Sequence, residues 1–166
     1  HQLELADILG AKHYRLFSFY DTDESDACFD LVCERIQQFV DAAKGSGVLL
    51  CHKNEKGIYG DTAAKCLKIH KALPDVKAIF DPANYIMDDA DITWAVDNTK
   101  QYIEYLHIKD ACLDGHIIVP AGYGDGKISE VLTKISEVKD DETSCSRCGS
   151  KEIKEEKFCR ILGTKL

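Results

Sequence analysis

The sequence contains no run of about 20 consecutive apolar residues, the length that a helix needs to cross a bilayer. It also lacks a basic start followed by an apolar stretch, so we expect no secretory signal peptide. Positive charge is scarce, because 29 Asp and Glu outnumber 21 Lys and Arg and the formal net charge is −8. Nucleic-acid-binding proteins usually present a basic face to the phosphates. We therefore expect neither a membrane nor a nucleic-acid partner.

The 8 cysteines lie mostly inside periodic apolar segments. Without a secretory signal, cysteines in such positions are typical of reduced thiols that pack as small hydrophobic side chains. This pattern favours a cytoplasmic protein. The cysteines in these segments are Cys28, Cys33, Cys51, Cys66 and Cys112.

Short apolar runs alternate with longer amphipathic segments along the chain. This alternation is typical of parallel strands joined by right-handed helical crossovers, and so of an α/β fold. Glycines between residues 115 and 126 indicate a loop or hairpin before the last helix, and the loop after the third strand contains Pro82 and Asn84. Strands are predicted within residues 13–19, 47–51, 76–80 and 102–108, and helices within 2–11, 29–43, 62–73, around 94–96 and 128–138.

The composition changes near residue 139, where charged residues replace the apolar pattern. We therefore divide the chain into an α/β unit at 1–138 and a charged, Cys-containing tail at 139–166. Cys145 and Cys148 form a Cys-x-x-Cys-Gly turn, and Cys159 follows. Such a turn can provide half of a zinc site, although a complete site needs four ligands. An extended tail with exposed thiols is the alternative interpretation.

A polar cluster follows each of three successive predicted strands directly. Ligands of parallel α/β proteins bind beyond the carboxyl ends of the strands, so these clusters are expected to meet at one rim. Asp81 and His107 offer a carboxylate and an imidazole, which suit a divalent metal that could polarise a sugar carbonyl. A structural Asp–His hydrogen bond is the simpler alternative. The clusters are His52-Lys53-Asn54-Glu55, Asp81-Pro82-Ala83-Asn84 and His107-Ile108-Lys109-Asp110.

Three strings, at residues 52–61, 80–84 and 105–110, resemble the xylose isomerase-like barrel family, and most closely its sugar-phosphate isomerase/epimerase branch. Residues 15–18 and 120–126 add to the resemblance, which extends over roughly residues 1–138. It implies a partial (β/α) TIM barrel with parallel strands that correspond to strands 4 to 7 of eight. The chain would then be truncated at its N-terminus and divergent at its C-terminus.

The same resemblance implies a divalent metal (Mn, Co, Zn or Mg) and a small sugar or sugar phosphate as substrate. Enediol-type isomerisation needs an acid or base close to the reacting carbon. The residues implied are Asp81 and His107 for the metal, His52 and Glu55 for proton transfer, and Asn84, Lys109 and Asp110 for the substrate.

Lys53 stands where the resemblance implies a Glu ligand of the metal. At about 4 Å and an effective dielectric of 20, a Lys ammonium repels a divalent ion by roughly 8 kcal/mol. Metal binding is therefore not expected in the family manner. We predict instead that Lys53 occupies the place of the metal and pairs with Asp81.

These observations predict an isomerase/epimerase-like chain that is weakened or inactive. The alternative is a non-catalytic barrel fragment that acts by self-association through open sheet edges or through a zinc-binding tail. A nuclease related to the apurinic-site endonucleases is a further alternative, which the low basic charge disfavours.

Overall fold

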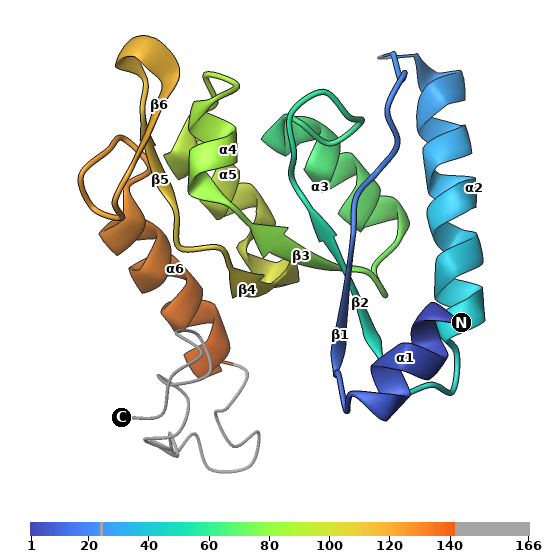
Figure 1. Cartoon of the computed structure of the whole chain (residues 1–166). Helices are drawn as coiled ribbons and strands as arrows, with labels where there is room; N and C mark the ends of the chain where they lie inside the picture. The colour runs from blue at the N-terminus through green and yellow to red at the C-terminus, as the bar shows by residue number, and fades with distance from the viewer. Residues whose placement is uncertain (24, 142–166) are drawn as a thin grey trace.

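The computed structural model describes residues 1–23 and 25–141, in which helices and strands alternate (Figure 1). Ser25, Thr62 and Asp91 cap three of the helices by accepting a hydrogen bond from a backbone N–H in the first turn. The strands are β1 (His13–Leu16), β2 (Leu49–Lys53), β3 (Lys77–Phe80), β4 (Ile103–Leu106), β5 (Asp110–Cys112) and β6 (Ile117–Val119). The helices are α1 (Gln2–Ile8), α2 (Asp26–Ala43), α3 (Ala63–Ala72), α4 (Pro82–Ile86), α5 (Ile92–Thr99) and α6 (Ile128–Asp141), with 3₁₀ turns η1 (Lys100–Tyr102) and η2 (Asp114–His116).

The main sheet has four strands in the order β1-β2-β3-β4, and every neighbouring pair is parallel. Within the described residues β1 pairs only with β2 and β4 only with β3, so both edges of this sheet are open. Parallel strands in sequential order with helical crossovers confirm the predicted partial (β/α) barrel.

One local element differs from the sequence prediction, and a second is decided between two predicted alternatives. The expected loop around Pro82 is the short helix α4, because proline fits the first helical turn and Asp81 caps it. The glycine-containing region forms an antiparallel hairpin of β5 and β6, one of the two predicted alternatives. Helix α6 continues to Asp141, slightly beyond the predicted end of the barrel unit at residue 138.

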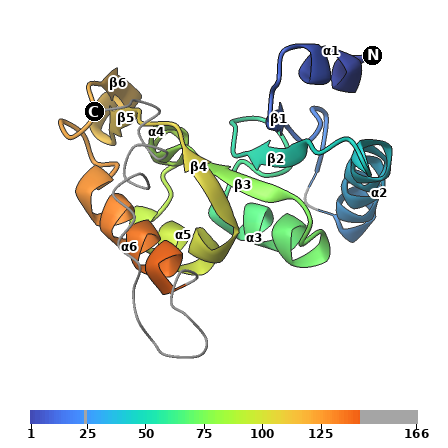
Figure 2. The ribbon, with the colours of Figure 1, turned by 90° about the horizontal axis from the view of Figure 1, so that it is seen from below.

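Helices α2, α3, α5 and α6 cover one face of the sheet, whereas α1 lies beside the start of β1 (Figure 2). Buried apolar residues on that face form two clusters, one under α2 and α3 and one under α5 and α6. The first is built around Leu16, Leu50, Ile36 and Ile69, and the second around Phe80, Leu106, Val96 and Ile135.

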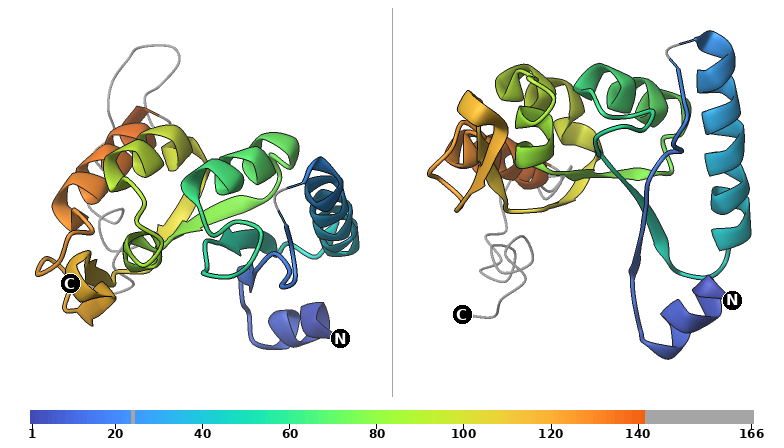
Figure 3. Two further views of the ribbon diagram at one scale, coloured as in Figure 1. Left: turned by 90° about the horizontal axis from the view of Figure 1, so that it is seen from above. Right: turned by 45° about the horizontal axis from the view of Figure 1, so that its top comes forward.

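The sheet is curved, as a barrel wall must be. His13 on β1 and Glu104 on β4 lie on the two edge strands, yet their side chains meet at 3.1 Å between Nε2 and Oε1. In a flat sheet these strands would be about 14 Å apart, at about 4.8 Å per strand, with parallel side-chain directions. The side chains that meet therefore mark the concave face, and the helices lie outside the curve (Figure 3).

The described residues also bear on membrane insertion and on the state of the cysteines. No helix in residues 1–23 and 25–141 is both long enough and apolar enough to span a membrane. The described cysteines are free thiols, as predicted. Cys145, Cys148 and Cys159, and with them the predicted zinc half-site, lie outside the described residues.

Candidate functional site

Asp81 lies at the centre of the polar rim, directly after β3, and is 0% exposed. Its Oδ1 caps α4 by accepting a hydrogen bond from the Asn84 N–H at 3.1 Å. Its Oδ2 accepts no well-directed hydrogen bond, and three nitrogen atoms approach it instead. These are Lys53 Nζ at 3.0 Å, Lys109 Nζ at 3.3 Å and His107 Nδ1 at 3.7 Å.

The short distance between Lys53 and Asp81 confirms the predicted ion pair. Both side chains are buried, at 5% and 1% exposure, so neither charge is screened by bulk water. Lys53 Nζ also lies 3.1 Å from Glu55 Oε2, which brings Glu55 to the same rim. The ammonium group therefore bridges two carboxylates, as a bound cation can.

Asn54 joins the ends of β2 and β3 beneath this centre. Its side-chain Nδ2 donates to the backbone carbonyl of Asp81 at 3.0 Å, and its side-chain Oδ1 accepts from the backbone N–H of Asp81 at 2.9 Å. This paired contact continues the sheet where the strands end. It fixes the backbone of Asp81 and so directs the carboxylate toward Lys53.

Asn84 holds Lys109 in place, instead of facing a substrate as predicted. Its Oδ1 accepts from Lys109 Nζ at 2.7 Å, and its Nδ2 donates to the Asn54 carbonyl at 3.0 Å. Asn84 is 6% exposed, and each end of its amide makes a hydrogen bond inside the protein. Lys109 is 40% exposed and remains accessible.

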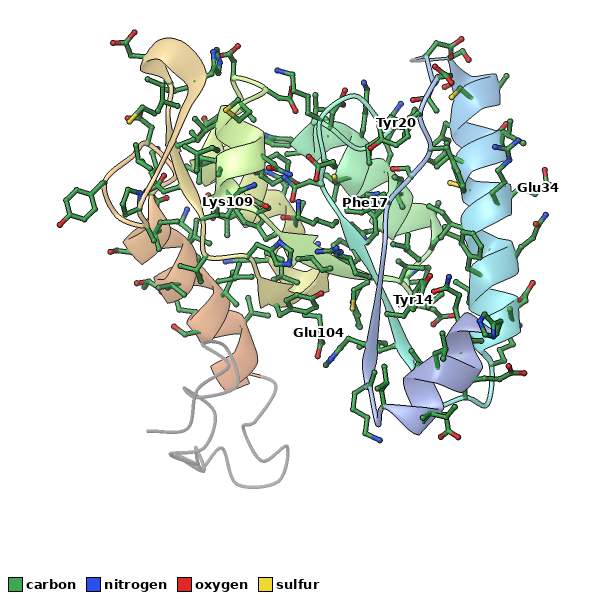
Figure 4. All side chains as sticks on the ribbon, in the orientation of Figure 1. Tyr14, Phe17, Tyr20, Glu34, Glu104 and Lys109 are labelled. Carbon is green, nitrogen blue, oxygen red and sulfur yellow. The ribbon has the colours of Figure 1, made fainter. Side chains whose placement is uncertain are left out.

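Arg15 and Lys53 both contact the ring of Phe17. The Arg15 guanidinium carbon lies 5.3 Å from the ring centroid and Lys53 Nζ lies 5.8 Å from it, which are cation–π distances. In Figure 4, Phe17 and Lys109 lie toward the upper end of the sheet and Glu104 lies lower. Arg15 thus extends the polar rim to the first strand.

The positive potential of this rim is reflected in His107. Burial lowers the pKa of His107, the charges of Lys53, Arg15 and Lys109 lower it further, and Asp81 opposes the shift. A neutral imidazole can donate one hydrogen bond and accept another. His107 is 30% exposed and so can contact a ligand on the concave face.

His52, predicted as a proton-transferring group, points away from this rim. Successive strand residues face opposite sides, so Lys53 faces the concave side and His52 faces the helices. His52 Nε2 lies 2.8 Å from Ser18 Oγ, and the His52 ring is 5.6 Å from the ring of His70. The cavity there has about 10 Å³, the volume of one water and too small for a sugar.

Asp110 also has a different role from the predicted contact with the substrate. It is 0% exposed, and its carboxylate accepts hydrogen bonds from the backbone N–H groups of four residues. A Cβ at Gly126 would lie 2.5 Å from Asp110 Oδ1, so glycine is required for this close approach. The four donors are Ala111, Gly122, Gly124 and Gly126.

The residues at the rim do not fit a divalent metal. In residues 1–23 and 25–141, no group of three or more His, Cys, Asp and Glu side chains is arranged to hold an ion. Asp81 and His107 are brought together as predicted, but the third position carries the Lys53 ammonium. A dication there would lose a ligand and meet a like charge.

Three residues of this site, Arg15, Phe17 and Asn54, lie in segments that the sequence singled out but were assigned no role. Arg15 and Phe17 alternate along the first predicted strand, and a charged residue inside an apolar strand is a detectable signal for a functional face. The role of Asn54 depends on the register between β2 and β3, which the sequence alone does not show.

The chain resembles known proteins both in its sequence pattern and in its fold. The model of the xylose isomerase-like TIM barrel family matches residues 1–144. A search of curated proteins finds no match.

Solved structures resemble the fold at low sequence identity. A D-tagatose 3-epimerase-like protein is 19% identical, with a TM-score of 0.69, and the match covers 83% of this chain and 56% of that one. A xylose isomerase-like TIM barrel protein from Mycobacterium smegmatis, in complex with magnesium, is 16% identical (TM-score 0.66; 82% and 54% covered). A D-allulose 3-epimerase from Methylomonas sp., in complex with D-allulose, is 13% identical (TM-score 0.64; 82% and 49%). The chain spans about half the length of these structures.

Acidification is expected to destabilise the fold through His52 and His70. Burial lowers the pKa of His52 to about 3 and that of His70 to about 4, whereas unfolded histidine titrates near 6.5. Below about pH 6.5 the unfolded chain therefore binds protons that the folded chain does not. The stability that depends on neutral His52 and His70 is therefore fully present above about pH 6.5. Toward pH 4 the free energy of unfolding falls by up to about 1.4 kcal/mol per pH unit for each histidine.

Urea denaturation between pH 7.5 and pH 5 measures this slope. His70→Gln should remove about half of it, whereas the exposed His116→Gln should leave it unchanged. A free energy of unfolding that is flat across this range would contradict the neutral, buried state of both rings.

Removal of the Asp110 carboxylate should loosen the glycine-containing loop. Asp110→Ala leaves four backbone N–H groups without their acceptor, so the free energy of unfolding should fall by about 3 to 5 kcal/mol. Urea denaturation measures the loss, and the exposed Asp114→Ala, with a change within about 0.5 kcal/mol, is the matched control. An unaltered stability in Asp110→Ala would leave the substrate role open again.

Removal of the Lys53 ammonium should leave a buried charge less well compensated. Lys53→Met keeps the aliphatic chain but removes the nearest cation from the buried Asp81 carboxylate. We expect the free energy of unfolding to fall by about 3 kcal/mol, and no further, because Lys109 still pairs with that carboxylate. Thermal and urea unfolding measure the loss. The control is Lys44→Met, whose ion pair with Asp41 is exposed and should contribute little to stability. Equal stability of Lys53→Met and the unmodified chain would show that the pair is not structural.

Proposed function

Since the chain belongs to the xylose isomerase-like TIM barrel family, we propose that its concave face binds a small sugar or sugar phosphate. We further propose that the metal-dependent isomerase or epimerase reaction of such enzymes is weak or absent in this chain. The observation that carries this proposal is the buried ion pair of Lys53 and Asp81 at 3.0 Å, placed where a metal would be held.

Sugar binding is supported by the groups that the concave face exposes. Lys109 and His107 are partly exposed and offer hydrogen-bond donors and an acceptor at the end of β4. Phe17 offers an aromatic ring directly after β1, at the opposite edge of the sheet. The D-allulose 3-epimerase from Methylomonas sp. is a related fold with a bound sugar.

Weak catalysis is supported by the state of the proton-transferring candidates. His52 faces the helices, and burial lowers its pKa to about 3, so it is not poised to exchange a proton near neutral pH. Glu55 lies at the rim but is paired with Lys53 at 3.1 Å. The related magnesium complex indicates that a divalent ion is plausible for the family, while Lys53 opposes one here. The free thiols support a reducing, cytoplasmic setting.

Calorimetry with Mn²⁺ and Co²⁺ tests the metal part of this proposal. The unmodified chain should bind neither ion at micromolar affinity. Lys53→Glu replaces the repelling ammonium with a third ligand beside Asp81 and His107, and it should bind metal. Adding Asp81→Ala to that variant should abolish the binding. Micromolar Mn²⁺ binding by the unmodified chain, lost in Asp81→Ala, would contradict the proposal.

The sugar part is tested on the same proteins. Free ketoses and their monophosphates are titrated into the unmodified chain, and turnover is followed by NMR with and without Mn²⁺. Binding without turnover is the expected result, and it should weaken in Lys109→Gln but not in Lys71→Gln, which alters an exposed lysine on α3. Failure of every sugar to bind, or rapid turnover, would overturn the proposal.

A further inference from the structure

The concave face carries an excess of positive charge around Asp81. Three cationic side chains, those of Arg15, Lys53 and Lys109, face the two carboxylates of Asp81 and Glu55. Lys53 and Lys109 converge on Asp81 Oδ2, and Arg15 shares the ring of Phe17 with Lys53. The chain as a whole has a formal net charge of −8, so this local excess runs against the overall charge.

Arg15 is the least compensated of these cations. Its guanidinium packs against Phe17, and among the described residues the ion pairs of Asp81, Glu55 and Glu104 are made with other side chains. A guanidinium group offers a planar set of N–H donors that matches phosphate oxygens. Packing on an aromatic ring fixes the direction of those donors without neutralising the charge.

Lys53 provides a cation that is part of the chain. A divalent ion at the same place would need three or more acidic or imidazole ligands, and the described residues offer no such group. The Lys53 ammonium contacts both Glu55 and Asp81, and Lys109 also pairs with Asp81, so the two lysines balance the two carboxylates before a ligand arrives. A phosphate dianion approaching the rim would therefore meet Arg15 and Lys109 without facing an unpaired carboxylate. A neutral sugar could accept hydrogen bonds from these groups but would lack the attraction between opposite net charges.

We infer that the concave face recognises phosphorylated sugars without a metal, with the Lys53 ammonium in place of the metal and with Arg15 and Lys109 contacting the phosphate. This inference rests on the proposed function, because it specifies the ligand class of the same site. It reverses the electrostatic character of the centre, which becomes a site for an anion in place of one for a cation.

The test compares a ketose, its monophosphate and inorganic phosphate by calorimetry, in EDTA and in Mn²⁺. The monophosphate should bind at least about tenfold more tightly than the free ketose, equally well in EDTA, and with an affinity that falls as salt is added. Inorganic phosphate should compete with it. Arg15→Gln should weaken binding of the monophosphate about tenfold and leave binding of the free ketose unchanged.

Arg35→Gln is the matched control, because the Arg35 guanidinium also packs on an aromatic ring, that of Phe19 at 5.2 Å, but belongs to α2. This variant should bind the monophosphate normally, and circular dichroism checks that both variants are folded. Equal affinity for ketose and monophosphate, an equal effect of both Arg variants, or a requirement for Mn²⁺ overturns the inference. In the first two cases sugar binding itself survives, whereas failure of both sugars to bind overturns the proposed function as well.

Discussion

A carboxylate with no exposed surface has to be neutralised, and this constraint on Asp81 organises the rim of the sheet. Asp81 caps α4 with one oxygen and meets Lys53 and Lys109 with the other. Asn54 fixes the Asp81 backbone and Asn84 fixes Lys109. The ends of β2, β3 and β4 are thus linked through one buried charge. Because the linking groups are side chains at strand ends, the site and the curvature of the sheet support each other.

Beside Asp81 and His107 the rim carries the Lys53 ammonium, where a metal centre would need a further ligand, so the charge at this position is positive. A divalent ion held by carboxylates can exchange a ligand and accept a substrate oxygen. The Lys53 ammonium is covalently attached, carries a single charge and uses its donors on Asp81, Glu55 and the Asn54 carbonyl. It can balance charge but it cannot act as a Lewis acid.

The alternation of short apolar runs with amphipathic segments was sufficient to predict a parallel sheet, whereas its sequential order was implied by the resemblance to the barrel family. Polar residues directly after strands were sufficient to predict that Asp81, His107 and Lys109 lie together. The partner of Lys53 was predicted from its charge at a position where the resemblance implies a metal ligand. The direction of each side chain was harder to predict. His52 adjoins Lys53 in sequence but faces the helices, because strand residues alternate, and the placement of that alternation depends on strand register. Asp110 appeared to be a rim residue because the hairpin that buries it has no periodic signal. The tail cysteines lie outside the described residues, so the zinc hypothesis stays a prediction.

The tethered ammonium of Lys53 has a consequence for how the fold depends on its surroundings. A protein that binds a metal only in its folded state gains stability as the logarithm of the free metal concentration, and it loses that stability to chelators. Here the neutralising cation is part of the polypeptide and is present at a fixed stoichiometry in every folded copy. In this arrangement the charge of Asp81 is balanced without an ion drawn from solution.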